Sequence, residues 1–386
     1  MQKIVYLDNG ATTKIDPKVL ETMLPYFDEK FGNASSLHVK GIEAKNSLEE
    51  ARKTIAKSIN AEPEEIIFTS GGTESNNFAI KGIAFSNKDK GNHIITTKVE
   101  HKCILESCKW LETQGFEITY LNVDKDGFIK LEELEKAITK KTILVSVIHG
   151  NNEIGTINDL EAIGKICKKH NIYFHTDACQ SYTKTELNVK KQNLDLVTIN
   201  AHKIHGPKGV GALYVKRGTK LKAWQNGGPQ EFRLRAGTEN VAGIVGFAKA
   251  VEIANNKKHV EKMTKLRDKL ISGILKIPDV SLNGPQGNKR LCNNANFAFK
   301  GVEGEAVSGY LDSFGICSST GSACSSTQLE PSYVLKAIGK TNEQANGSLR
   351  LTLSRFTTEE EIDYVLEKMP IIIKKLRSFS PIYKRD

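Results

Sequence analysis

Short apolar runs rich in isoleucine and valine alternate with helical patterns along the first 260 residues of the chain. Seven runs predict strands: 64–70, 93–97, 118–123, 142–149, 172–176, 194–200 and 211–215. Their nearly continuous apolar character is typical of a sheet that is buried on both faces. Helical periodicity marks three segments between them: 47–59, 131–139 and 159–170. The alternation favours an α/β architecture with a mostly parallel sheet.

The pattern changes after about residue 260. A long charged helix is predicted over 259–277, followed by a strand at 294–299, a helix at 304–314 and a strand at 348–354. A last helix is expected over 357–377, and Pro370 should kink or interrupt it. We therefore expect a large domain over 15–259, and a smaller α+β domain made of 1–14 together with 260–386.

Length and composition are those of a soluble globular protein. The chain has 386 residues, of which 39% are hydrophobic, and this length favours two or three domains. No apolar run approaches the roughly 18 residues that a membrane span requires. Asp8 interrupts the N-terminus before the apolar core of a signal peptide could form. We expect a cytoplasmic protein that does not bind membranes.

The charge and the cysteines narrow the choice of partners. The formal net charge of +10 would suit an acidic partner such as RNA, but the basic residues form no dominant block. We therefore favour an ordinary solvated surface and expect no direct binding to nucleic acid. Seven cysteines, with no CxxC pair among them, argue against a disulfide scaffold or a structural zinc site. Free thiols are typical of a reducing compartment.

One candidate site follows the first predicted strand. In "IIFTSGGTESNN" (66–77), Ser70, Gly71, Gly72 and Thr73 stand where a helix begins. Backbone N–H groups and a hydroxyl at a helix N-terminus can bind an anion, most naturally a phosphate. The alternative is a capped tight turn, and the motif alone does not decide between them.

Two further strand ends carry side chains that suit a cofactor. Asp177 and Gln180 follow the strand at 172–176, where an aspartate is otherwise often an N-cap. Lys203 follows the strand at 194–200, next to His202, and such a lysine can form a Schiff base with an aldehyde cofactor. A phosphate cradle, a lysine and an aspartate are the parts that pyridoxal phosphate requires. The H-x-x-H spacing of His202 and His205 has no nearby carboxylate or cysteine, so we do not expect a metal there.

Other polar residues are ambiguous when taken singly. His101 and Asn152 each follow a strand, and each could be an ordinary hydrogen-bonded loop residue. Arg350 or Arg355 could clamp a carboxylate through two parallel hydrogen bonds, or could pair with the glutamates at 359–361. Cys324 lies in "SSTGSACSST" (318–327), where it is either an ordinary loop residue or a reactive thiol.

The motifs taken together resemble those of the NifS/IscS-like cysteine desulfurases in the class-V pyridoxal-phosphate-dependent aminotransferase family. The similarity runs nearly end to end. It includes "YLDNGATT", "GNASSLH", "FTSGGTESNN", "EHKC", "NNEIGT", "DACQ", "AHKIHGPKG", "RAGTEN", "GSACSS", "LEPSYVLKAIG" and "SLRLTLSRFTTEEEID". The resemblance implies the type I fold of pyridoxal-phosphate-dependent transferases, with a seven-stranded, mostly parallel sheet in the large domain. It also implies a mobile loop at about 317–330 that carries the catalytic cysteine.

The resemblance assigns a role to each residue of the site. It implies that Lys203 holds the cofactor covalently and that Cys324 is the nucleophile, with His101 stacked on the ring and helping to move protons. Asp177 would pair with the pyridine nitrogen, and Gln180 would bond the ring hydroxyl. The other implied cofactor contacts are Gly72, Thr73, Asn152, Asn200, Ala201 and His202. Thr238 would reach the phosphate of a partner subunit, which implies a homodimer.

The same resemblance implies the reaction and its partners. L-cysteine would be held through its α-carboxylate by Arg350 and Asn152 and converted to L-alanine. The sulfur would become a persulfide on Cys324 and pass to acceptor proteins for iron–sulfur cluster assembly, tRNA thiolation or both. No metal is expected in the free enzyme, although Cys324 could transiently ligate a 2Fe-2S cluster together with a scaffold protein.

Three positions depart from the usual family wording. Asn200 stands where a hydroxyl residue is common, and we expect phosphate binding to be retained because an amide can also donate. Phe232 and Arg233 stand where Arg-Gly is expected.

Three rival functions are less favoured. An aminotransferase on the same fold has no use for a mobile thiol such as Cys324, whereas a selenocysteine lyase activity stays open as a side reaction. A non-catalytic RNA-binding or sulfur-relay module would need neither Lys203 nor Asp177.

Overall fold

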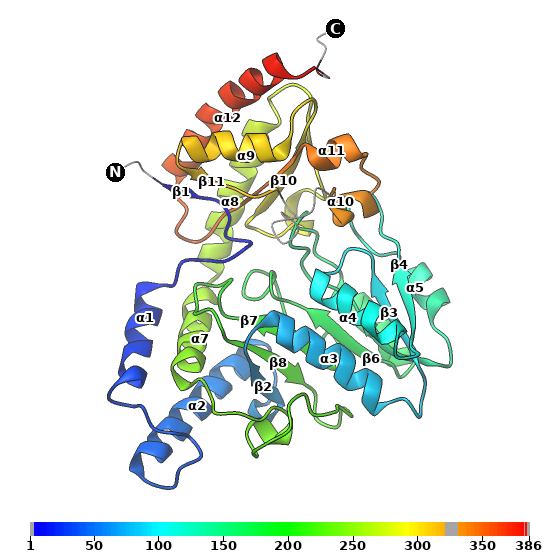
Figure 1. The fold of residues 1–386 in the computed structure, drawn as a ribbon, viewed down its shortest axis with the longest axis vertical. Coiled ribbons are helices and arrows are strands. Elements are labelled where there is room, and N and C mark those ends of the chain that lie inside the picture. Colours follow the sequence, from blue (N-terminus) through cyan, green and yellow to red (C-terminus); the bar gives the residue numbers. More distant parts are fainter. Residues whose placement is uncertain (1–3, 321–330, 382, 384–386) are drawn as a thin grey trace.

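The computed structural model describes residues 4–320, 331–381 and 383. The large α/β part occupies the lower half of Figure 1, and the smaller part, with both ends of the chain, occupies the upper half. Helix α8 (Lys257–Ile274) starts beside the large part and runs up into the smaller one.

The large part is built on the predicted sheet of seven strands. In sheet order these are β2 (Ile66–Thr69), β8 (Gly211–Val215), β7 (Leu196–Asn200), β6 (Tyr173–Asp177), β5 (Thr142–Ser146), β3 (His93–Thr97) and β4 (Glu117–Leu121). Only β8 runs against the others, so the sheet is mostly parallel, as predicted. Each strand lies within a few residues of its apolar run, because those runs bury both faces of the sheet.

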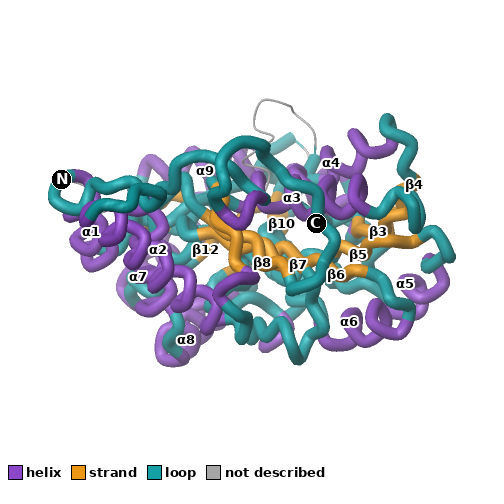
Figure 2. Tube along the Cα trace, turned by 90° about the horizontal axis from the view of Figure 1, so that it is seen from below, coloured by secondary structure: helices purple, strands orange, loops and turns teal. Residues whose placement is uncertain are grey.

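Helices cover both faces of this sheet (Figure 2). One face carries α3 (Gly72–Ser86) and α4 (Lys102–Glu112), and the other carries α5 (Leu131–Ala137) and α6 (Leu160–Lys169). At the edge next to β2, α2 (Val39–Ser58) and α1 (Pro17–Met23) pack on α7 (Val241–Ala254). One buried hydrophobic cluster lies on each face of the sheet, and the two clusters form the core that holds the strand ends in place.

The smaller part has a sheet and a core of its own. Its strands are β9 (Val280–Leu282), β10 (Asn294–Phe299) and β12 (Ser348–Thr352), in the order β12-β10-β9, and β1 (Val5–Tyr6) with β11 (Ile316–Cys317). Its helices are α8, α9 (Gly304–Ser313), α10 (Tyr333–Ala337), α11 (Asn342–Asn346) and α12 (Glu359–Phe379). Val5 and Leu7 join its buried cluster, so the start of the chain packs here. The exact domain boundaries, at 14/15 and 259/260, stay a prediction.

Pro370 does not interrupt the last helix, contrary to one of the two predicted outcomes. Helix α12 is continuous through this position, and the proline ring lies on its exposed side. Met369, Ile372 and Ile373 on the opposite side are buried in the core of the smaller part. Their burial outweighs the loss of one backbone hydrogen bond.

None of the described helices combines the length and the apolar character that a membrane span requires.

Candidate active site

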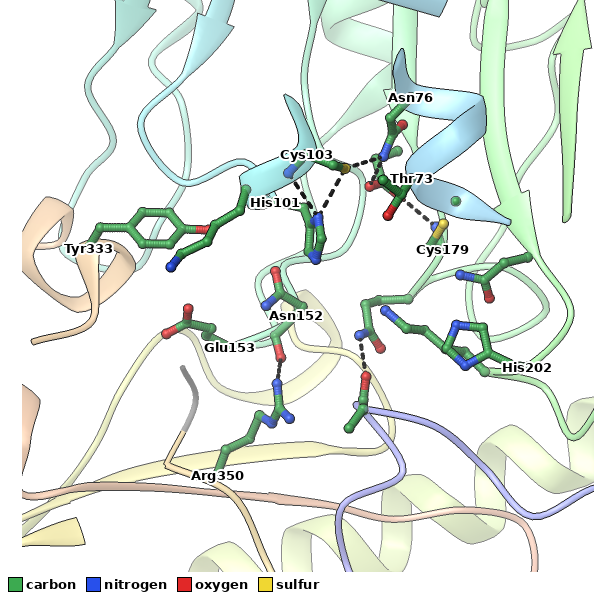
Figure 3. Close-up of a pocket in the computed structure, with 18 residues that line it drawn as sticks. Thr73, Asn76, His101, Cys103, Asn152, Glu153, Cys179, His202, Tyr333 and Arg350 are labelled. Atoms are coloured by element: carbon green, nitrogen blue, oxygen red, sulfur yellow. Dashed lines mark hydrogen bonds between the residues drawn. The ribbon is translucent and has the colours of Figure 1, made fainter. Parts of the chain in front are cut away.

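A cavity of about 310 Å³ lies where the strand ends of β6 and β7 meet the first turns of α3 and α4 (Figure 3). Ten predicted site residues line it: Gly72, Thr73, His101, Asn152, Asp177, Gln180, Asn200, His202, Lys203 and Arg350. The carboxyl ends of parallel strands meet at one edge of a sheet, which brings these distant segments together. Arg350 reaches the cavity from β12, so the site lies between the two parts of the molecule.

The first turn of α3 forms one end of the cavity. Gly71 caps the helix with φ +153°, a conformation that favours glycine. A Cβ at Gly72 would lie 2.6 Å from Sγ of Cys179 and 3.4 Å from Nδ2 of Asn200, so only glycine fits here without displacing Cys179. The N–H of Ser70, expected in the anion cradle, instead donates to Glu74 Oε2 at 2.7 Å.

Asp177 is the last residue of β6 and accepts hydrogen bonds at both carboxylate oxygens. Nδ2 of Asn76 donates to Oδ2 at 2.7 Å, and the N–H of Cys179 donates to Oδ1 at 2.9 Å. We did not predict Asn76 as a site residue. Its place one helical turn after Gly72 was the available signal, since residues four apart share a helix face.

Lys203, His202 and Gln180 line another part of the cavity. The backbone oxygen of Lys203 accepts from Nζ of Lys184 at 3.3 Å, and the same ammonium donates to the backbone oxygen of Gln180 at 2.9 Å. The Gln180 amide donates to the backbone oxygen of Gly10 at 2.9 Å. Burial, assisted by the charge of Lys203, lowers the pKa of His202 to about 4. His202 is therefore neutral near pH 7.

His101 caps the N-terminus of α4. Its Nδ1 accepts the N–H of Cys103 at 3.2 Å, and the Cys103 sulfur lies 3.0 Å from the same nitrogen. Burial lowers the pKa of His101, so the ring favours its neutral form. Cys103 and Cys179 both line the cavity, and the sequence analysis assigned neither a role.

Arg350 is the arginine that reaches the cavity. Its Nη1 donates to the backbone oxygen of Asn152 at 2.9 Å, and its Nη2 donates to Asp8 Oδ1 at 2.9 Å. Within the described part of the chain, the buried Nε has no partner, and neither has the buried Oδ1 of Asn152. Arg355 points elsewhere and pairs with Asp16 at 2.6 Å, rather than with the glutamates at 359–361.

Cys324 lies outside the described residues, but the chain on both sides of 321–330 contacts the cavity wall. Ser319 and Arg350 exchange backbone hydrogen bonds of 2.6 and 3.2 Å. On the other side, Ser332 Oγ donates to a carboxylate oxygen of Glu153, which also lines the cavity. Burial raises the pKa of Glu153 to about 7.

Two predicted cofactor contacts do not line this cavity. The side chain of Ala201 lies in the core, and its N–H donates to the backbone oxygen of Val210 at 3.3 Å. Thr238 is exposed and follows the short turn η3 (Glu231–Arg233). Among the described residues, no group of three histidine, cysteine or acidic side chains is arranged to hold a metal ion.

Comparisons with known proteins agree with this geometry. The family model described as "Aminotransferase class-V" matches residues 5–365. A protein named cysteine desulfurase IscS from Clostridium botulinum (strain Hall) is 54% identical over the whole chain and 98% of its own length. A second so named, from Methanosarcina thermophila, is 51% identical over the whole chain and 95% of its length.

The chain belongs to the class-V aminotransferase family. Within that family it groups with the pyridoxal-phosphate-dependent cysteine desulfurases, as the sequence motifs predicted.

Solved structures lead to the same group. A NifS-like protein superposes with a TM-score of 0.91 at 40% identity, covering 97% of this chain and all of that one. The structure titled "SspA in complex with cysteine" gives a TM-score of 0.83 at 36% identity, covering 92% of this chain and all of that one. The fold is therefore that of the NifS-like enzymes, and the predicted fold class is confirmed.

Proposed function

We propose that this cavity converts L-cysteine to L-alanine and that Cys324 receives the sulfur as a persulfide. The observation that carries the proposal is that Lys203, Asp177 and Arg350, from three separate segments, line one cavity. Residues on both sides of the segment that contains Cys324 contact its wall, through Ser319 and Ser332.

The residues present suit pyridoxal phosphate. When bound, this cofactor supplies an aldehyde that reacts with amines and a ring that accepts electrons from a bond broken at the substrate's α-carbon. The absence of a side chain at Gly72 and the Asn200 amide, whose oxygen has no partner among the described residues and whose NH₂ group can donate to an anion, fit a phosphate here. Gly72, Thr73, Asn200 and His202 would hold the phosphate. Asp177 would hold the pyridine nitrogen, Gln180 the ring hydroxyl and Lys203 the aldehyde carbon.

The remaining lining residues would bind and orient cysteine. The free edge of the Arg350 guanidinium, with Nε available, can donate to the substrate's α-carboxylate, and the amide of Asn152 can join it. The amine of Lys203 would accept the α-proton on Nζ. His101 lines the same cavity as Lys203 and Arg350.

Sulfur transfer then requires one nucleophile. The thiolate of Cys324 attacks the substrate's Sγ, the new S–S bond forms, and the Cβ–Sγ bond breaks. Its electron pair stays with the carbon skeleton, which takes up a proton and leaves as alanine. Cys324 keeps the outer sulfur as a persulfide, so no external oxidant is needed.

Mass spectrometry of the protein after incubation with cysteine and digestion to peptides tests this proposal. The wild-type enzyme should gain one sulfur atom on the peptide that contains Cys324 and should release alanine. Cys324→Ser should keep the colour of the bound cofactor and form no persulfide there. Cys317→Ser is the matched control, because this half-buried thiol belongs to the preceding strand β11 and should not be needed. Persulfide formation at the wild-type level in Cys324→Ser would disprove the assignment.

We further propose a homodimer in which Thr238 completes the site of the partner subunit. Thr238 is exposed and lies outside the cavity of its own chain, which leaves it available to another copy. Sedimentation at micromolar concentration should give twice the chain mass of 42.7 kDa. Thr238→Ala should weaken cofactor binding without dissociating the dimer, and a monomer with full activity would contradict this arrangement.

We also propose that the sulfur acceptor is a protein of cytoplasmic iron–sulfur assembly, tRNA thiolation or both. The name IscS of the similar proteins supports this class, and the six described cysteines are all free, as expected in a reducing compartment. Trapping the acceptor as a mixed disulfide on Cys324 would identify it. Recovery of no acceptor by wild-type enzyme that does form the persulfide would argue against transfer to a protein.

A further inference from the structure

Cys103 lies between His101, a proposed cofactor contact, and Asn76, which contacts Asp177. Its sulfur is 3.0 Å from Nδ1 of His101 and 3.2 Å from Nδ2 of Asn76 (Figure 3). Nδ2 of Asn76 also donates to Asp177 at 2.7 Å. A continuous hydrogen-bonded chain therefore runs from Asp177 through Asn76 and Cys103 to His101.

The direction of each hydrogen bond in this chain follows from the chemistry of its members. A carboxylate oxygen accepts, so the Asn76 amide must turn its NH₂ group toward Asp177, because the opposite orientation would place two acceptors together. The two hydrogens of this NH₂ group are then donated to Asp177 and to the Cys103 sulfur. The sulfur accepts from Asn76, and its own hydrogen is left for Nδ1 of His101.

Two further observations support this direction. Burial raises the pKa of Cys103 to about 12, so the sulfur keeps its hydrogen near neutral pH. The backbone N–H of Cys103 also donates to Nδ1 of His101, at 3.2 Å. With two donors directed at it, Nδ1 carries no proton. In the neutral ring the proton must then be on Nε2, on the far side of the ring from Cys103.

We propose that Cys103 is a positioning residue that holds His101 in the tautomer with its proton on Nε2 and couples the ring to Asp177 through Asn76. The inference deepens the proposed function, since it rests on His101 and Asp177 being cofactor contacts. This tautomer also separates the proton-transfer roles of His101 and Lys203. With its proton on Nε2, His101 presents a proton donor to the cavity and not a base. Lys203 is left to accept the substrate's α-proton, and His101 can donate a proton from Nε2.

Nitrogen NMR of histidine-labelled protein tests the tautomer directly, because the two ring nitrogens give different signals with and without a proton. The signals of His101 are assigned by their loss in His101→Gln. The wild-type enzyme should show a bare Nδ1 and a protonated Nε2. Cys103→Ser, which keeps a hydroxyl donor, should preserve this pattern. Cys103→Ala leaves the backbone N–H of residue 103 as the one remaining donor of the two described at Nδ1, and should give a mixture of tautomers or broadened signals.

Turnover adds a second measurement. Removing one hydrogen-bonded partner changes free energy by roughly 0.5–1.5 kcal/mol, which corresponds to about 2- to 13-fold in rate. We expect Cys103→Ala to lower kcat by about this factor with a smaller change in KM, and Cys103→Ser to recover most of the loss. Cys108→Ala is the matched control, since Cys108 lies in the same helix, is fully buried and faces the core. It should lower stability without moving the His101 signals.

The outcomes separate this inference from the proposed function. A wild-type His101 that carries its proton on Nδ1 would overturn the inference even if the variants failed to fold. Cys103→Ala with an unchanged single tautomer would overturn it too, whatever happens to kcat. A wild-type enzyme with the expected tautomer and no turnover of cysteine would instead contradict the proposed function.

Discussion

Gly72 illustrates how much of the site depends on a missing side chain. A methyl group at this position would lie 2.6 Å from the Cys179 sulfur and 3.4 Å from Nδ2 of Asn200. Cys179 is buried and cannot easily move aside. A side chain at position 72 would therefore displace Cys179 or the first turn of α3, and both of these line the cavity.

Gly72→Ala should weaken the binding of pyridoxal phosphate. Overpacking costs about 1–3 kcal/mol, so we expect roughly 5- to 150-fold weaker binding in an absorbance titration of the cofactor-free enzyme. Gly309→Ala in α9 is the control. No atom lies within 4 Å of a Cβ there, and helix propensity predicts a gain of up to about 1 kcal/mol in stability with unchanged cofactor binding. Equal affinity in Gly72→Ala and the wild-type enzyme would contradict this role of Gly72.

The site residues differ in how far the sequence could predict them. Asp177, Asn200 and Lys203 stand at the ends of clearly apolar strands, so a pattern of strands is enough to place them together. Asn76 and Cys103 carried no comparable signal. Asn76 and its partner Asp177 are 101 positions apart, and the contact between them depends on the packing of α3 on the sheet.

At the level of elements, the turn before Thr238 is held in an unusual conformation. Glu231, Phe232 and Arg233 all have φ between +42° and +65°, a left-handed region that costs roughly 1–2 kcal/mol for each such residue. The buried Glu231 carboxylate accepts two hydrogen bonds from Arg52, at 2.8 and 2.9 Å, and one from the N–H of Phe68 at 2.7 Å. These bonds fasten the turn to α2 and β2.

Arg52→Met should destabilise the fold by roughly 3–5 kcal/mol, because it leaves the Glu231 carboxylate buried without a counter-charge. Urea unfolding at fixed protein concentration measures this loss. Lys53→Met is the matched control, since the neighbouring Lys53 pairs with Glu50 on the exposed surface, and its removal should leave the unfolding curve unchanged. Two coinciding curves for the Arg52 and Lys53 variants would show that the buried pair does not hold the turn.

The elements themselves were predictable to different degrees. The seven strands of the large sheet were predicted because long β-branched runs need two covered faces. The two-residue strands β1 and β11 were missed, since each is too short to show a period and forms only by pairing with the other. Helix α7 was also missed. It is apolar nearly all round and packs under both α1 and α2, which removes the amphipathic pattern of a surface helix.

For the whole molecule, buried histidines link the sheet to the pH dependence of stability. His175 is fully buried in β6, and its ring lies 2.8 Å from the Ser146 hydroxyl in β5 and 3.1 Å from the Thr198 hydroxyl in β7. Burial lowers the pKa of His175 to about 4, and that of His149 likewise. The neutral imidazole ring of His175 thus joins the neighbouring strands β5, β6 and β7.

The sign of the effect follows from the two states. An unfolded chain has His175 near its ordinary pKa of about 6.5, so between that value and about 4 the unfolded chain binds more protons than the folded one. The contribution of His175 to stability is complete above about pH 6.5 and is lost as the pH falls toward 4. Each unit of displacement is worth about 1.4 kcal/mol, which gives a loss of roughly 3 kcal/mol.

His175→Gln should therefore be less stable than the wild-type enzyme at pH 7.5, and the deficit should shrink steadily toward pH 4.5. Urea unfolding at half-unit pH steps, followed by tryptophan fluorescence, gives both curves. Cys167→Ala is the control, because this thiol is also buried in the core but its pKa is raised to about 12, so it does not titrate in this range. Its deficit should stay constant with pH. A constant deficit for His175→Gln as well would mean that the buried ring does not couple the central sheet to pH.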